Sequence, residues 1–226
     1  IVSTFRPSDD ASILPFVIPQ NLFAMAVLRD AAPMLSTLDI DYPAAVDFAN
    51  LADDIEKGLN DHATYDHLHY GKVYAYECDG MGNRLFLDDA NIPSLLSLPY
   101  FRVCSKSDPV YRNTRRFVLS KDNPYYFVDS NERIAGIGSP HTLPPKIWPL
   151  SIIMQALTSE HDDEIIVCIR NLVRSSVSTG FIHESFLPDD PERYTRAWFA
   201  MANAMFGELI LSVFEEKPEL LAKVAM

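Results

Sequence analysis

Apolar residues recur at helical spacing along most of this chain, and this repeat limits the folds that it can adopt. In an α-helix, residues three and four positions apart lie on one face, so each repeat predicts a helix with one buried side. The segments that carry the repeat are residues 20–35, 41–60, 108–118, 148–157, 164–173 and 194–214. The sequence therefore predicts an all-α fold.

The first two segments show how the buried faces are expected to run. In the first, the buried stripe consists of Phe23, Ala26, Val27 and Ala31. Asp41 and Pro43 are typical of an N-cap and a first-turn proline, and they open the second helix. Its inward residues are expected to be Ala45, Phe48, Ala52, Ile55 and Leu59.

Long segments rich in proline, glycine, aspartate and aromatic residues separate the helices. They are residues 3–19, 65–94, 120–145 and 178–193. Loops of this length are usually functional, so a site is expected there. Residues 72–77 and 84–87 alternate as strands do, and Gly80–Gly82 between them predicts a small hairpin.

No change of composition and no internal repeat marks a domain boundary, so residues 1–226 are expected to form a single domain. The chain is 48% apolar, and its net charge of −12 repels nucleic-acid backbones and anionic lipid headgroups. We therefore expect no nucleic-acid partner and no membrane contact from this segment. A neutral or cationic partner fits the charge better.

Cysteine spacing and hydrophobicity exclude two further classes. Cys78, Cys104 and Cys168 lie far apart with no CxxC pair, which predicts buried thiols and no zinc framework. No apolar run reaches the roughly 18 residues that cross a bilayer. Because the chain starts at Ile1 rather than methionine, either a signal or an entire N-terminal region is expected to have been removed, and the compartment is not predicted.

Carboxylates gather in the loops, away from lysines. Asp9 with Asp10, Asp88 with Asp89, and Glu184 all have small, aromatic or histidine neighbours. Hydrolysis of a glycosidic bond needs one carboxylic acid to protonate the leaving oxygen and a second carboxylate to activate water or attack the sugar. These loops could supply both, although a single loop aspartate can also cap a helix or close a turn.

Glu184 stands in an apolar setting, the sequence Phe-Ile-His-Glu-Ser-Phe of residues 181–186. A charge among such neighbours is costly unless it is paired or used. The adjacent His183 could hydrogen-bond a substrate or fill a structural position in the core. Both interpretations stay open at this point.

Other chemistries find less support. The chain has no GxSxG motif, and Gly136–His141 lacks the third glycine of a phosphate-binding loop. His67 and His69 beside Asp66 fit an exposed turn better than a metal site. We therefore expect neither a metal nor another cofactor.

Aromatic residues and an arginine pair share the loops with the carboxylates. Flat aromatic side chains suit the apolar face of a sugar ring, although core packing is the simpler explanation of each one alone. The aromatic residues are Tyr74, Tyr76, Tyr100, Tyr125, Tyr126 and Trp148. Arg115 and Arg116 are helical neighbours that point in different directions, so only one of them is expected to reach a pocket.

Six short blocks follow one another along the chain. They are Phe5–Asp10, Tyr74–Glu77 with Asp79–Gly80, Asp88–Leu96, Asn113–Arg116, Gly138–Thr142 and His183–Phe186. Together they resemble the ordered signature of the exo-α-1,6-mannosidases of glycoside hydrolase family 125. The resemblance runs from about Ser3 to about Leu211.

This resemblance implies an (α/α)6 barrel of paired helices, of which the chain would hold roughly the C-terminal half, with the N-terminal part missing. It also implies metal-independent removal of terminal mannose with inversion at the anomeric carbon. Glu184 matches the position of the base, and the acid maps to Asp10 or Asp9, with Asp10 favoured. The two catalytic carboxyl groups should then lie about 6.5 to 9.5 Å apart.

The remaining polar blocks are expected to surround the sugar. Asp88, Asp89, Arg115, His141 and His183 should hydrogen-bond mannose hydroxyls or orient the two carboxylates. The expected partners are a mannose-containing glycan and the missing N-terminal half, which would cover the apolar helix faces of an incomplete barrel. Two alternatives stay open, a non-catalytic carbohydrate-binding module derived from this fold and an (α/α)6 glycosidase of different sugar specificity.

Overall fold

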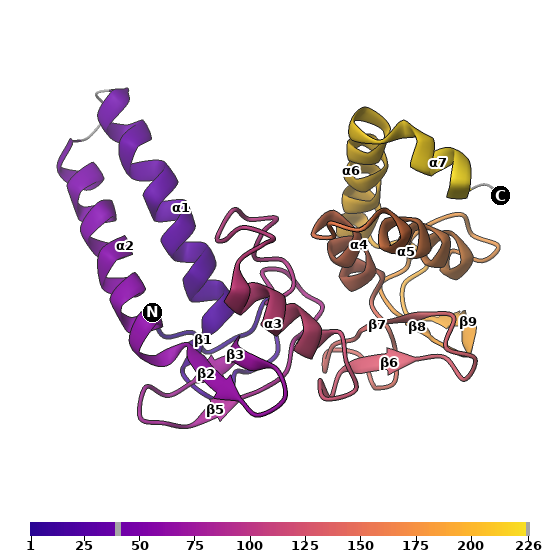
Figure 1. Cartoon of the computed structure of the whole chain (residues 1–226), viewed down its shortest axis with the longest axis horizontal. Coiled ribbons are helices and arrows are strands. Elements are labelled where there is room, and N and C mark those ends of the chain that lie inside the picture. Colours follow the sequence, from indigo (N-terminus) through magenta and orange to yellow (C-terminus); the bar gives the residue numbers. More distant parts are fainter. Residues whose placement is uncertain (39–41, 225–226) are drawn as a thin grey trace. The chain divides into compact units, whose positions relative to one another are not determined.

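The computed structural model describes residues 1–38 and 42–224. They form two compact units, of which the first comprises residues 1–87 and 93–117 and the second comprises residues 88–92 and 118–226. Figure 1 shows the helices and strands of both units. The expected cap at Asp41 lies outside the described residues.

The first unit is built on two long helices, α1 (Ile18–Thr37) and α2 (Tyr42–His62), which pack side by side (Figure 1). Its other elements are β1 (Phe16–Val17), β2 (Thr64–His67), β3 (Gly71–Tyr74), β4 (Glu77–Cys78), β5 (Arg84–Leu85) and α3 (Pro109–Val118). Strands β1, β4 and β5 form an antiparallel sheet, and β2 pairs with β3. The predicted hairpin around Gly80–Gly82 is thus confirmed as β4–β5.

The buried faces of α1 and α2 follow the prediction to different degrees. In α2, four of the five expected inward residues are buried, and Phe48 is half-buried. In α1 the predicted stripe is wrong, because Leu22 and Met25 are buried whereas Val27 is 46% exposed. Apolar residues occur on several sides of α1, so spacing alone does not select the packed face.

The second unit combines four helices with two hairpins. Its elements are β6 (Tyr126–Val128), β7 (Ala135–Ile137), α4 (Pro149–Leu157), α5 (Asp162–Ser175), β8 (Phe186–Leu187), β9 (Asp190–Tyr194), α6 (Ala200–Glu216) and α7 (Pro218–Val224). Strand β6 pairs with β7, and β8 pairs with β9, both antiparallel. Helix α4 packs against α5 and α6, which places its apolar residues in the core.

Two predicted segments are corrected. The helix expected from residue 194 begins only at Ala200, because Tyr194 pairs with Phe186 in the β8–β9 hairpin. The single strand expected over residues 72–77 is two strands, β3 and β4, which pair with different partners.

Helices dominate the described part of the chain, so the mainly α-helical prediction is confirmed at that level. The chain is not purely helical, because the long loops at 120–145 and 178–193 each contain a hairpin. None of the described helices is both long enough and apolar enough to cross a membrane.

Candidate active site

Asp9 and Asp10 lie at the turn of a loop in the first unit, residues 3–15, which we call the acid loop. The backbone N–H of Arg6 donates to the carbonyl oxygen of Asp10 at 2.8 Å, and the N–H of Asp9 donates to the carbonyl oxygen of Arg6 at 3.0 Å. Asp9 has a φ of 65°, a left-handed conformation in which aspartate is enriched. Asp9 is exposed and Asp10 is half-buried, so Asp10 is the better shielded from water.

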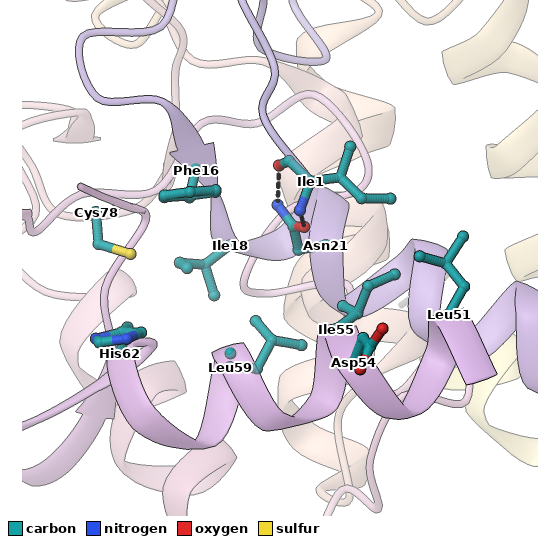
Figure 2. A pocket seen from close by; sticks show the side chains of 11 residues that line it. Ile1, Phe16, Ile18, Asn21, Leu51, Asp54, Ile55, Leu59, His62 and Cys78 are labelled. Carbon is teal, nitrogen blue, oxygen red and sulfur yellow. Dashed lines mark hydrogen bonds between the residues drawn. The ribbon is translucent and has the colours of Figure 1, made fainter. Parts of the chain in front are cut away.

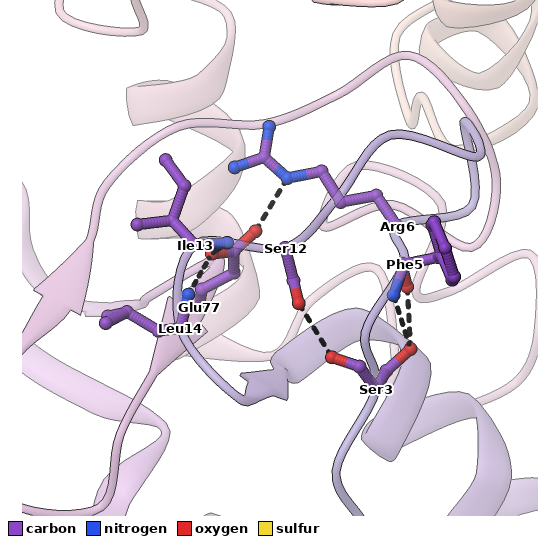
Figure 3. Close-up of polar contacts among 7 residues, drawn as sticks. All are labelled: Ser3, Phe5, Arg6, Ser12, Ile13, Leu14 and Glu77. Atoms are coloured by element: carbon purple, nitrogen blue, oxygen red, sulfur yellow. Dashed lines mark hydrogen bonds and ion pairs between the residues drawn. The ribbon is translucent and has the colours of Figure 1, made fainter.

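A buried ion pair fastens this loop to strand β4 (Figure 3). Arg6 donates through Nε to Oε1 of Glu77 at 2.6 Å, and the two side chains are 4% and 0% exposed. The backbone N–H groups of Ile13 and Leu14 donate to Oε2 of Glu77, each at 2.8 Å. Neither Arg6 nor Glu77 was predicted as a functional residue, although both belong to the six blocks.

Arg115 lies on α3 and is half-buried, whereas Arg116 is exposed. The Arg116 guanidinium lies 5.7 Å from the centroid of the Tyr70 ring. Thr114 fixes this helix to β3, because its Oγ1 accepts from the backbone N–H of Tyr74 at 2.9 Å. Arg115 is thus the less exposed of the two arginines, and its reach into a pocket stays a prediction.

Asp88 and Asp89 are both fully buried in the second unit. One carboxylate oxygen of Asp89, Oδ1, accepts from the backbone N–H of Asn91 at 3.1 Å and from its side-chain amide at 3.0 Å.

Hydrogen bonds connect this segment to residues 138 and 139. The side-chain amide of Asn91 donates to Ser139 Oγ at 3.3 Å, and the N–H of Ala90 donates to the carbonyl oxygen of Gly138 at 3.0 Å. The fold thus joins two of the six blocks, Asp88–Leu96 and Gly138–Thr142.

Gly138 is required at this junction. A Cβ atom built on it would lie 2.2 Å from the carbonyl oxygen of Lys146 and 2.7 Å from the Phe127 ring. Such separations are far below van der Waals contact, so a larger residue would force the two backbone segments apart.

His141 is exposed, and its backbone N–H donates to Ser139 Oγ at 3.2 Å. Its ring meets the Trp148 ring edge-on, with 6.1 Å between the centroids. Trp148 is 2% exposed and donates through Nε1 to Thr142 Oγ1 at 2.8 Å, so it is part of the core that supports His141. Tyr76 is likewise fully buried, which favours core packing for both of these aromatic residues.

His183 is 1% exposed and is held on two sides. Its Nδ1 lies 2.8 Å from the carbonyl oxygen of Ala197, and its ring stacks on Tyr194 with centroids 3.9 Å apart. A carbonyl oxygen only accepts, so Nδ1 carries the hydrogen, and Nε2 of the neutral ring is an acceptor. Within residues 1–38 and 42–224, no hydrogen-bond partner of the buried Nε2 is present.

Glu184 is 5% exposed and pairs with Arg196, whose Nε lies 3.2 Å from its Oε1. The backbone N–H of Glu184 also donates to the carbonyl oxygen of Arg196 at 3.2 Å. The Arg196 side chain is 62% exposed, so the pair lies at the edge of the solvent rather than in the core. Arg196 was missed by sequence reasoning, because only the β8–β9 hairpin brings it opposite Glu184.

The predicted site residues are divided between the two units. Asp9, Asp10 and Arg115 belong to the first unit, and Asp88, Asp89, His141, His183 and Glu184 belong to the second. The described residues contain no group of three or more His, Cys, Asp or Glu side chains that could hold a metal ion. The His67 ring packs at tilted angles against the rings of Tyr70 and Phe117.

A cavity of about 300 Å³ in the first unit is lined by none of these residues. Figure 2 shows that Ile18, Ile55 and Leu59 line it, together with Cys78.

Burial raises the pKa of the Cys78 thiol, which keeps it neutral. Cys168 is also buried and Cys104 is half-buried, so the prediction of buried thiols holds for two of the three cysteines.

Comparisons with known proteins agree with the six blocks. A model of the family described as metal-independent alpha-mannosidase (GH125) matches residues 1–211. The meiotically up-regulated gene 157 protein of Schizosaccharomyces pombe is 47% identical over 229 residues, which cover 100% of this chain and 44% of that protein.

Solved structures give the same result. A metal-independent α-mannosidase of Streptococcus pneumoniae, in a non-productive complex with α-1,6-mannobiose, matches with a TM-score of 0.91 and 40% identity over 96% of this chain and 51% of its own. A bacterial glucoamylase complexed with acarbose matches with a TM-score of 0.65 and 17% identity over 91% of this chain and 35% of its own, which indicates a likeness of fold alone. The chain spans about half the length of the first two relatives.

Proposed function

Because the chain belongs to glycoside hydrolase family 125, the metal-independent α-mannosidases, we propose that it carries the site of an exo-acting enzyme that removes terminal α-1,6-linked mannose. The observation that carries this proposal is the 40% identity to a mannosidase that was solved with α-1,6-mannobiose. The substrate is accordingly a mannose-containing glycan or oligosaccharide.

The proposed mechanism uses Asp10 as the acid and Glu184 as the base. Asp10 protonates the glycosidic oxygen as its bond to the anomeric carbon breaks, while Glu184 takes a proton from a water that attacks the opposite face of the ring. The half-buried position of Asp10 supports this role, since the loop shields this carboxyl from bulk water better than that of Asp9. The pairing of Glu184 with Arg196 supports the other role, because the ion pair holds the side chain of Glu184 in one position.

Asp88, Asp89, Arg115, His141 and His183 are proposed to surround the sugar or to orient the two carboxylates. The buried acceptor Nε2 of His183, next to Glu184, supports a hydrogen bond to a mannose hydroxyl. Asp89 is better suited to shaping the loop, because its Oδ1 already accepts two hydrogen bonds from Asn91.

We propose that both units belong to one (α/α)6 domain, of which this chain provides about half. The match of 51% of the pneumococcal chain supports this extent. The other half of the same protein is then the partner that completes the barrel.

The test is hydrolysis of α-1,6-mannobiose by the intact protein, followed by proton NMR in the first minutes of the reaction. We expect free mannose to appear first as the β-anomer, and a chelator to leave the rate unchanged. A first product in the α-form would contradict inversion. Binding without hydrolysis would favour a carbohydrate-binding module, and release of glucose or glucuronate from the matching disaccharides would favour a different glycosidase.

A further inference from the structure

Glu77 is a buried charge that the proposed mechanism leaves without a role. It is 0% exposed, and a carboxylate in such a place is costly unless it is paired and hydrogen-bonded. Both of its oxygens meet donors, Oε1 the guanidinium of Arg6 and Oε2 the backbone N–H groups of Ile13 and Leu14. Its charge is therefore satisfied within the protein.

The three donors come from the two arms of the acid loop (Figure 3). Arg6 precedes Asp9 and Asp10, whereas Ile13 and Leu14 follow them. The two arms also pair with each other, through an antiparallel bridge between Phe5 and Ala11. One carboxylate on strand β4 thus holds both sides of the turn that presents Asp10.

Strand β4 gives this anchor a fixed position. Glu77 pairs with Val17 of β1 on one side and with Leu85 of β5 on the other, so it lies on the central strand of the sheet. The Arg6 guanidinium is also supported by the Tyr76 ring, at 5.4 Å from its centroid. A rigid support of this kind is what a general acid needs, since the rate depends on how closely its proton meets the leaving oxygen.

We propose that Glu77 is a positioning residue for the general acid, a role that rests on the proposed function and deepens it. Glu77 fixes both arms of the acid loop and so holds the Asp10 carboxyl at the glycosidic oxygen. It does not touch the substrate, because its side chain is fully buried and its oxygens are occupied. Its effect reaches the reaction only through Asp10.

The test compares two substrates that differ in their need for an acid. The leaving mannose of α-1,6-mannobiose must be protonated, whereas the 2,4-dinitrophenolate of an aryl α-mannoside leaves without help. We expect Glu77→Gln to lower kcat on the disaccharide at least about tenfold and to leave kcat on the aryl mannoside within about twofold. Asp10→Asn should show the same selective loss in a stronger form.

Two further variants separate positioning from a loss of folding. Glu77→Asp keeps a counter-charge for Arg6 but shortens the side chain by one methylene, so it should fold and still show the selective loss. Glu56→Gln is the matched control, because Glu56 also pairs with an arginine of the first unit, Arg29 at 2.6 Å, but on the exposed surface of the helix pair. Equal losses on both substrates in a folded Glu77 variant, or no loss on either, would overturn the proposal.

Hydrogen exchange tests the anchor without any activity. We expect the peptide that contains Arg6–Leu14 to exchange faster in Glu77→Asp than in the unaltered protein, with no change in Glu56→Gln. Unchanged exchange in Glu77→Asp would overturn the proposal. If the unaltered protein hydrolyses neither substrate, the proposed function fails, and the exchange measurement still decides whether Glu77 holds the loop.

Discussion

Glu184 is a buried acidic residue that forms an ion pair with an exposed arginine. The carboxylate is 5% exposed, yet its partner Arg196 reaches the solvent, so the pair is only partly desolvated. This arrangement differs from the ion pair of Arg6 and Glu77, in which both side chains are buried. Altering Glu184 leaves no charge in the core, because Arg196 is exposed. Altering Glu77 removes the counter-charge of Arg6, which is buried.

At Glu184 we therefore predict a catalytic loss without a loss of folding. Glu184→Gln keeps the shape of the side chain but removes the base, so kcat on α-1,6-mannobiose should fall by about 10² to 10⁴. The melting temperature should stay close to that of the unaltered protein. Glu192→Gln, an exposed change on β9, serves as the control, and full activity of the Glu184 variant would contradict the mechanism.

At His183 the two ring nitrogens can be tested separately. His183→Asn retains a donor near the position of Nδ1 and so keeps the bond to Ala197, but it lacks an acceptor at Nε2. If Nε2 accepts from a mannose hydroxyl, KM should rise about 5- to 10-fold, the value of one hydrogen bond. An unchanged KM in His183→Asn would assign the residue a structural role only.

The β6–β7 hairpin depends on one aspartate at its turn. Asp129 is buried, and its Oδ1 accepts from the backbone N–H groups of Arg133 and Ile134. Burial alone would raise the pKa of this carboxyl, but the hydrogen bonds from Ile134 and Arg133 outweigh burial and hold the pKa below its ordinary value. A lowered pKa in the folded state means that ionised Asp129 stabilises the fold.

For this hairpin we predict a stability difference that depends on pH. Asp129→Asn should lower the free energy of unfolding by about 1 to 2 kcal/mol at neutral pH, since charge-assisted hydrogen bonds become neutral ones. The stabilisation is complete above the unfolded pKa of about 3.9 and is lost as the pH falls through the lower folded value. The difference between variant and parent, measured by urea unfolding, should therefore shrink at acidic pH. Asp66→Asn, an exposed hairpin change, should have little effect at any pH.

A second prediction about local structure concerns the close packing at Gly138. Gly138→Ala would place a methyl group against Lys146 and Phe127, so it should destabilise the protein by about 3 kcal/mol or more. Gly207→Ala is the matched change in helix α6, where no atom lies within 4 Å of an added Cβ. It should instead stabilise by about 0.5 to 1 kcal/mol, because alanine favours a helix over glycine. Equal melting temperatures would contradict this contrast.

The chain as a whole exposes apolar side chains on its helices. Exposed examples on α1 and α2 are Val27, Met34, Val46 and Leu51, and on α6 they are Met201, Leu211 and Phe214. Large exposed apolar patches mark interaction sites, so these residues are where contacts with further protein are expected.

We predict that residues 1–226 expressed alone will self-associate. The exposed apolar side chains of the described helices should bind one another, and sedimentation velocity should show species larger than 25.5 kDa. Adding the other half of the proposed (α/α)6 domain should restore a single defined species. A well-behaved monomer of residues 1–226 would refute the expectation that these faces need a cover.

Most of the helices could be predicted from the sequence, because their signal is local. Helical spacing relates residues three or four positions apart, and α2 accordingly buries the face that was expected. A block such as His183–Phe186 is likewise read without knowledge of its neighbours in space. The sequence by itself therefore determined the family, the helical character and the residues to examine.

The tertiary structure decided which of these residues act together. Arg6 and Glu77 are 71 positions apart and form a pair only because the acid loop packs against β4. Tyr194 has the apolar spacing of a helix but pairs as a strand with Phe186, and this pairing brings Arg196 to Glu184. Buried charges and cross-strand pairs depend on contacts between distant segments, and no local pattern in the chain encodes those contacts.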